Sequence, residues 1–103
     1  MTLKITELEK NDKICKMSID GEMDINTYKK VKDKLNKIID EESIDIELDF
    51  ENLSYIDSTG IGVLIGILKK LNKKEQSLVI KNAKDNIKRL FNITGLDKIF
   101  ILQ

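Results

Sequence analysis

Histidine, tryptophan and proline are absent from the 103-residue sequence. Histidine is the commonest general base and a common ligand of transition metals, so its absence removes many routes to catalysis and metal binding. In particular, no Ser-His-Asp triad can be assembled. We therefore expect that the chain is not an enzyme, that it has no catalytic residue, and that it binds neither a metal ion nor a cofactor.

Cysteine and arginine occur once each. Cys15 has no second cysteine for an internal disulfide, and its place in an alternating pattern predicts a small buried apolar side chain more than a reactive thiol. Because Arg89 is the only arginine, the chain has no cluster of guanidinium groups with which to bind phosphates or base edges. The 18 basic and 18 acidic residues cancel. These features predict no direct contact with nucleic acid or membrane.

Long apolar runs are also missing. The longest, residues 61–68, has eight residues and includes two glycines, whereas a membrane-spanning helix needs about 20 apolar residues. Residues 1–4 lead directly into a strand-like pattern, so we expect no signal peptide. Residues 1–103 are therefore predicted to form a single cytoplasmic domain.

Alternation of apolar and polar residues predicts strands over residues 3–9, 14–20 and 44–50. Asn11 and Asp12 supply turn chemistry between the first two, which indicates a hairpin. Residues 77–80 and 99–102 are short apolar runs that we interpret as two further strands, the first central and the second at the edge of the sheet.

Apolar residues at three- and four-residue spacing predict three helices. The first ends near Glu41, the second near Asn72 and the third before Gly95. The order β-β-α-β-α-β-α-β predicts an α/β fold with a mixed, mostly parallel sheet, an antiparallel first pair and helices packed mainly on one face. Acidic residues line one side of residues 44–50, so we expect the helices to cover the opposite face of the sheet. The face with the acidic residues is then either open or covered by a partner. The expected core consists of Cys15, Met17, Ile19, Ile46, Leu48, Ile61, Leu64, Ile65, Leu68, Val79, Leu90 and Phe91.

The stretch Tyr-Ile-Asp-Ser-Thr-Gly-Ile-Gly at residues 55–62 lies where the strand pattern becomes a helix pattern. Asp57, Ser58 and Thr59 are all residue types that cap helix N-termini. A hydroxyl here would lie at the positive end of a helix, where a phosphate meets free N–H groups and a favourable dipole. The alternative is that these residues supply only capping and turn chemistry.

Other functions fit the junction less well. A hydrolase nucleophile motif has glycine two residues before the serine, where this chain has Ile56. The glycines match neither common phosphate-binding loop, so a nucleotide-binding module is a weak alternative. A phospho-aspartate receiver domain could use Asp49 or Asp57, but that fold opens with a strand and a helix, whereas this chain is predicted to open with a hairpin.

The segment Asp57-Ser58-Thr59-Gly60-Ile61-Gly62 resembles the phosphorylation signature of bacterial anti-sigma factor antagonists, which are small STAS-domain proteins. The resemblance extends to Asp-Gly-Glu-Met-Asp at residues 20–24 and to Thr-Gly-Leu-Asp-Lys-Ile-Phe at residues 94–100. In order and spacing it covers nearly the whole chain. It implies a single STAS-like domain.

The resemblance also implies partners. In this family, the unmodified protein binds an anti-sigma factor that is also a serine kinase, and this frees the sigma factor. The kinase uses ATP to phosphorylate the serine that matches Ser58, and a metal-dependent serine phosphatase restores the antagonist. Thr59 is the alternative acceptor. The residues that the resemblance assigns to partner binding are Asp24, Asp57, Ser58, Thr59, Gly60 and Gly62.

The same domain type also occurs in stress-signalling assemblies, in lipid-transport complexes and as the tail of anion transporters. A whole anion transporter is excluded because the chain has no membrane segment. A scaffold or accessory role in one of the other complexes is the alternative function. The intact Asp-Ser-Thr-Gly sequence at residues 57–60 favours the phosphorylatable class.

Overall fold

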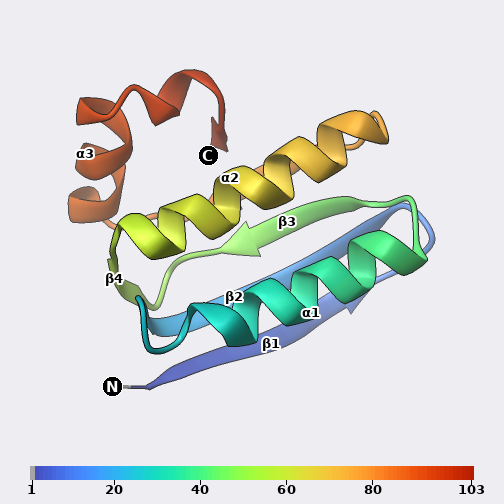
Figure 1. The fold of residues 1–103 in the computed structure, drawn as a ribbon, viewed down its shortest axis with the longest axis horizontal. Coiled ribbons are helices and arrows are strands. Elements are labelled where there is room, and N and C mark those ends of the chain that lie inside the picture. The colour runs from blue at the N-terminus through green and yellow to red at the C-terminus, as the bar shows by residue number, and fades with distance from the viewer. Residues whose placement is uncertain (1) are drawn as a thin grey trace.

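The computed structural model describes residues 2–103, so Met1 of the expected domain lies outside the described residues. A mixed sheet, three α-helices and one short 3-10 helix make up this part of the chain (Figure 1). The elements are, in chain order, β1 (Leu3–Lys10), β2 (Ile14–Met23), α1 (Tyr28–Glu41), β3 (Asp45–Asp49), β4 (Leu53–Ile56), α2 (Ser58–Lys73), β5 (Leu78–Lys81), α3 (Asp85–Ile93), η1 (Leu96–Lys98) and β6 (Ile101–Leu102).

The strands follow the order β1-β2-β3-β5-β6, with β1 antiparallel to β2 and the remaining pairs parallel. The hairpin, the mixed sheet and the α/β class predicted from the sequence are thus confirmed. β2 is long enough to pair with two strands in turn: Ile14 to Ser18 pair with β3, and Gly21 to Met23 pair with β4. The end of β2 therefore lies directly beside the strand that leads into α2.

β4 is missing from the expected element order. Its residues do not alternate, because Leu53 and Ile56 are buried while Ser54 and Tyr55 between them are exposed. The pairing of β4 with β2 shifts register between Gly21 and Glu22, and this irregularity interrupts the alternation of inward and outward side chains. A four-residue strand with this burial pattern gives no periodic signal.

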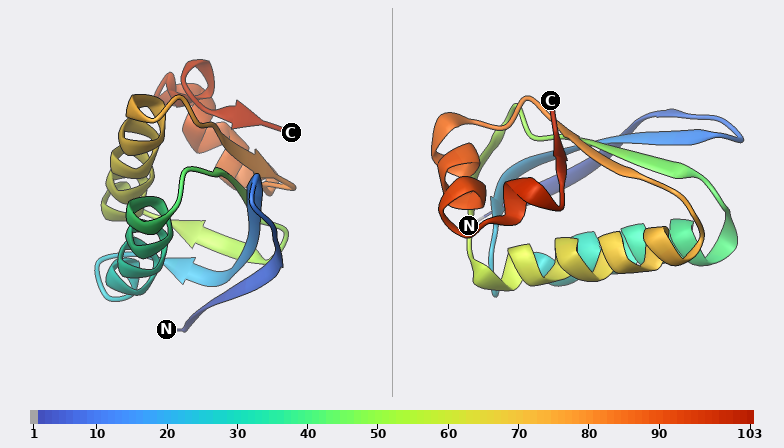
Figure 2. Two further views of the ribbon diagram at one scale, coloured as in Figure 1. Left: turned by 90° about the vertical axis from the view of Figure 1, so that its right-hand side faces the viewer. Right: turned by 90° about the horizontal axis from the view of Figure 1, so that it is seen from above.

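Helices α1 and α2 run side by side in the same direction over one face of the sheet, whereas α3 lies at the end of the sheet beside the start of α2 (Figures 1 and 2). Polar and charged side chains alternate with the core residues on the opposite face. There, Lys81 and Glu47 form a salt bridge with a 3.3 Å separation of nitrogen and oxygen. The expected arrangement of helices mainly on one face is confirmed.

Most of the expected core residues are buried, including Cys15, whose thiol pKa is raised by burial. The expected core position of Val79 was wrong. Val79 pairs opposite Glu47 on the helix-free face, while its neighbours Leu78 and Ile80 are buried. Because all three are apolar, the sequence carries no alternation from which the inward side could be identified.

The other two exceptions are Ile65 and Leu90, which are half-buried and pack against the edge of the core. Within residues 2–103, no helix is both long and apolar enough to cross a membrane.

The first turn of α2 packs directly onto the ends of β2 and β4. A Cβ atom at Gly60 would lie 2.8 Å from Ile56 Cγ1 and 3.0 Å from the carbonyl oxygen of Met23. Glycine is therefore required at position 60 by close approach. The later glycines of α2 differ, because a Cβ atom at Gly62 or Gly66 would meet nothing within 4 Å.

Alanine substitution of the buried Leu48 or Leu64 should each lower the free energy of unfolding by about 2–5 kcal/mol, because each leaves a cavity in a closed core. Val79→Ala on the helix-free face is the matched control and should cost less. Urea unfolding midpoints provide the measurement. An unchanged midpoint for either leucine variant would contradict the observed packing.

Substitutions at two glycines of α2 should have opposite effects on stability. Gly60→Ala should destabilise the protein by about 1–3 kcal/mol, because the added methyl group forces the helix away from Met23 and Ile56. Gly66→Ala should stabilise it by about 0.4–1 kcal/mol, because alanine favours the helix and finds open space. Thermal unfolding distinguishes the two. Equal effects would show that the start of α2 is not packed as described.

Candidate functional site

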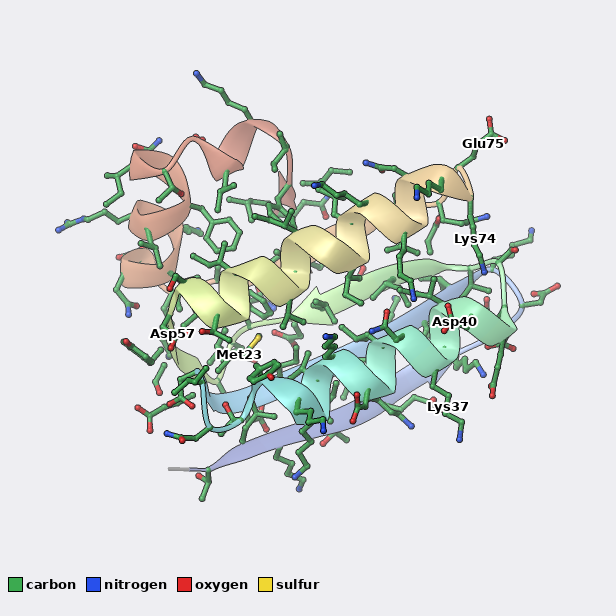
Figure 3. All side chains as sticks on the ribbon, in the orientation of Figure 1. Met23, Lys37, Asp40, Asp57, Lys74 and Glu75 are labelled. Carbon is green, nitrogen blue, oxygen red and sulfur yellow. The ribbon has the colours of Figure 1, made fainter. Side chains whose placement is uncertain are left out.

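The expected site residues after position 56 gather at the start of α2. Asp57 is the N-cap residue: its Oδ1 accepts a hydrogen bond from the backbone N–H of Gly60 at 3.0 Å. Its own backbone N–H donates to the carbonyl oxygen of Met23 at 3.1 Å. Figure 3 shows Asp57 and Met23 at this end of α2. The capping interpretation of Asp57 is therefore confirmed, and the cap also ties α2 to the end of β2.

Ser58 is the first residue of α2, and it is exposed. Its hydroxyl forms no hydrogen bond with any other residue in the described part of the chain. Asp57 caps the N–H of Gly60, which leaves the N–H groups of Ser58 and Thr59 without an intrahelical partner. An acceptor group attached to Ser58 would lie beside these donors and the positive end of the helix dipole.

Two nearby hydroxyls are less available than that of Ser58. Ser54 is exposed, but its hydroxyl donates to the carbonyl oxygen of Gly21 at 3.0 Å. Thr59 is half-buried and lines a groove between α1 and α2. Of the three, Ser58 alone combines exposure with a hydroxyl that forms no hydrogen bond to residues 2–103.

Asp24 lies next to this site but below the surface, with 4% of its area exposed. Its Oδ1 accepts hydrogen bonds from the backbone N–H of Asn26 at 2.8 Å and from the Thr27 hydroxyl at 3.3 Å. Its Oδ2 is buried without a partner in the described residues. The carboxylate thus shapes the turn before α1, and this turn leaves the neighbouring Ile25 63% exposed.

Ile25 and Tyr55 are site residues that the sequence analysis missed. Both are large apolar or aromatic side chains with exposed fractions of 63% and 47%. Ile25 comes after the end of β2, and Tyr55 lies within β4, where it pairs with Glu22. For Ile25 the available signal was an apolar residue between the polar Asp24 and Asn26, outside a periodic segment, whereas nothing in the sequence around Tyr55 indicated its exposure. Exposed apolar side chains that gather into a patch are typical of protein interfaces.

Grooves flank Ser58 on both sides. The α2–α3 groove, with a volume of about 490 Å³, is lined by residues that include Tyr55, Ser58, Ile61, Ile87, Leu90 and Thr94. The α1–α2 groove, with a volume of about 600 Å³, is lined by residues that include Ile25, Tyr28, Thr59, Gly62, Val63 and Gly66. Ser58 therefore lines the α2–α3 groove, while its neighbour Thr59 lines the α1–α2 groove.

The site contains the components of a recognition surface. It has an accessible hydroxyl, a helix N-terminus and exposed apolar side chains on either side. Within residues 2–103, no group of three His, Cys, Asp or Glu side chains is placed to hold a metal ion.

The chain is similar to known proteins over most of its length. The STAS domain family matches residues 6–103. An anti-sigma-B factor antagonist of Staphylococcus aureus is 40% identical over 96 residues, which cover 93% of this chain and 88% of the relative. A corresponding protein of Staphylococcus epidermidis is 36% identical over the same shares of both chains.

Solved structures of similar proteins share the fold. The anti-sigma factor antagonist SpoIIAA in its unphosphorylated form has a TM-score of 0.77 at 18% identity, with 97% of this chain and 87% of that chain covered. Phosphorylated SpoIIAA of Bacillus has a TM-score of 0.74 at 19% identity, with 99% and 91% covered. An anti-sigma factor antagonist of Mycobacterium paratuberculosis has a TM-score of 0.76 at 26% identity, with 96% and 85% covered. The chain belongs to the anti-sigma factor antagonist family of STAS-domain proteins.

Proposed function

We propose that the unphosphorylated protein binds an anti-sigma factor with serine kinase activity in the cytoplasm and so frees a sigma factor. Phosphorylation of Ser58 by that kinase ends the complex, and a serine phosphatase restores it. The proposal rests chiefly on Ser58, which is exposed at the N-terminus of α2 beside two grooves. Its hydroxyl forms no hydrogen bond with another described residue. Membership of the family and the name of the Staphylococcus relative support it.

A phosphate on Ser58 should be tolerated by the fold. It adds about −1.5 to −2 charges next to the carboxylate of Asp57, which is unfavourable. The free N–H groups and the dipole at the start of α2 oppose this cost with about 0.3–1 kcal/mol. The fold is similar to both the unphosphorylated and the phosphorylated structures of SpoIIAA, which supports a modification that leaves the domain intact.

At a partner surface the same phosphate has no such compensation. Exposed Ile25 and Tyr55, together with the two grooves, indicate a contact that removes water from around Ser58. A dianion at the centre of such a contact would have to lose its hydration, and an uncompensated buried charge costs about 2–5 kcal/mol. The proposed switch therefore acts on binding and leaves the stability of the domain nearly unchanged.

The remaining site residues have positioning roles in this proposal. Asp57 and Gly60 fix the start of α2 through the cap and the close contact with Met23. Gly62 and Thr59 line the groove beside Ser58. Asp24 orders the turn that presents Ile25. None of these residues is assigned a catalytic step.

Incubation with the cognate kinase and ATP should place a single phosphate on Ser58, because its hydroxyl is exposed and forms no hydrogen bond with another described residue. Phosphopeptide mapping of wild type, Ser58→Ala, Ser54→Ala and Thr59→Val identifies the acceptor. Label should be lost only in Ser58→Ala. Continued labelling of Ser58→Ala at Thr59 or Ser54 would overturn the assignment.

Variants at Ser58 should separate binding from stability. Ser58→Ala should keep its affinity for the kinase even with ATP present. Ser58→Asp and the phosphoprotein should bind about 30- to several-thousand-fold more weakly, which corresponds to about 2–5 kcal/mol. Their free energies of unfolding should stay within about 1 kcal/mol of wild type.

Calorimetric binding and thermal unfolding of the same four samples provide the measurement. Unchanged affinity in the phosphoprotein would rule out the switch. A large change in thermal midpoint would replace the interface mechanism with an internal rearrangement of the domain.

A further inference from the structure

The α1–α2 groove extends away from Ser58 along α2. Its walls are α1 and α2, which run in the same direction with both N-terminal ends near the site (Figure 1). On the α2 side it is lined by Gly62, Val63, Gly66 and Ile67, and on the α1 side by Tyr28 and Asn36. The groove thus has an apolar lining that continues for at least one helical turn beyond the proposed phosphorylation site.

The domain itself does not explain the two glycines of this groove. Glycine inside a helix lowers helix stability relative to alanine. Gly60 is accounted for by its contact with Ile56 and Met23, but a Cβ atom at Gly62 or Gly66 would meet nothing within 4 Å. These two positions therefore leave room for something outside the domain to approach the backbone of α2 closely.

The lysines at the groove differ in whether an acidic partner compensates their charge. Lys32 of α1 and Lys70 of α2 line it, and no acidic residue does. Lys70 closes the end far from Ser58, where its ammonium group donates to Asn36 Oδ1 at 2.9 Å and to Asp40 Oδ1 at 3.0 Å. Lys32 forms no salt bridge within the described residues. An occupant with acidic groups beside an apolar face would complement this groove.

We propose that the α1–α2 groove receives an amphipathic helix of the anti-sigma factor, with small or aliphatic side chains facing Gly62 and Gly66 and an acidic side chain near Lys32. The inference rests on the proposed function, because it extends the contact around Ser58. The two sites are continuous: Thr59 follows Ser58 in the chain and lines the groove, and the exposed Ile25 lies at the groove as well. Docking of a helix in an apolar groove is a recurring mode of recognition.

A second copy of this chain is a poorer occupant. The outward side of α1 carries several lysines, including Lys29, Lys34 and Lys37, all of them exposed. A lysine-rich helix would be repelled by Lys32, which has no salt-bridge partner in the described residues. An acidic helix from a different protein meets no such repulsion.

Gly66→Leu tests the inference by filling the groove at a distance from Ser58. Leucine favours the helix and meets open space at its Cβ, so the variant should unfold at or above the wild-type temperature. Its affinity for the anti-sigma factor, measured without ATP, should fall by about tenfold or more, as for a blocked anchor position. Lys69→Leu is the matched control, because Lys69 is exposed on α2 and does not line the groove; its affinity should be unchanged.

A charge reversal tests the acidic side of the occupant. Lys32→Glu should weaken binding by about tenfold, with the larger part of the loss at low salt. Lys37→Glu makes the same change on the side of α1 that faces away from α2 (Figure 3) and should bind nearly as wild type.

The outcomes separate the inference from the proposed function. Tight binding by wild type and equal binding by Gly66→Leu and Lys69→Leu would overturn the inference alone. Failure of wild type and Ser58→Ala to bind the anti-sigma factor would overturn the proposed function, and the inference with it. Self-association of wild type that Gly66→Leu abolishes would assign the groove to a second copy and also overturn the inference.

Discussion

The junction between β4 and α2 depends on the contact of Asp57 with Met23. The backbone N–H of Asp57 donates to the carbonyl oxygen of Met23, while its carboxylate caps the N–H of Gly60. Gly60 in turn approaches Met23 and Ile56 so closely that no side chain fits. These contacts join the ends of two strands to the first turn of a 16-residue helix. Ser58 is therefore held at a fixed place on the surface without its own side chain taking part.

This separation explains why a switch at Ser58 can affect partners more than the fold. The groups that fix α2 are the backbone, the Asp57 carboxylate and the buried faces of Met23 and Ile56. The Ser58 hydroxyl takes no part in these contacts, so the proposed modification would change the charge beside the two grooves without breaking them. The proposed phosphate would then weaken the binding of the protein that covers Ile25, Tyr55 and the grooves.

The periodic parts of the sequence predicted most of the fold, and the irregular parts did not. The alternation in β2 and β3 and the apolar stripes of α1 and α2 identified the sheet, the helix-covered face and most of the core. Val79 was misplaced because Leu78, Val79 and Ile80 do not alternate. β4 was missed because its pairing with β2 shifts register. For the site, capping chemistry predicted Asp57 as a candidate N-cap residue, and the family resemblance singled out Ser58. The burial of Asp24, the exposure of Ile25 and the two grooves arise only from tertiary packing.

In the proposed function, Ser58 is a charge switch at the start of α2, and the domain beneath it does not rearrange. Amide proton–nitrogen correlation spectra of the protein before and after phosphorylation test this most directly. The proposed switch predicts shifts confined to the first turn of α2, the side of α3 that lines the groove with Ser58, the end of β4 and the turn after β2, with β3 and β5 unchanged. Shifts that spread through β3 and β5 would contradict it, because they would show that the modification alters the packing of the sheet.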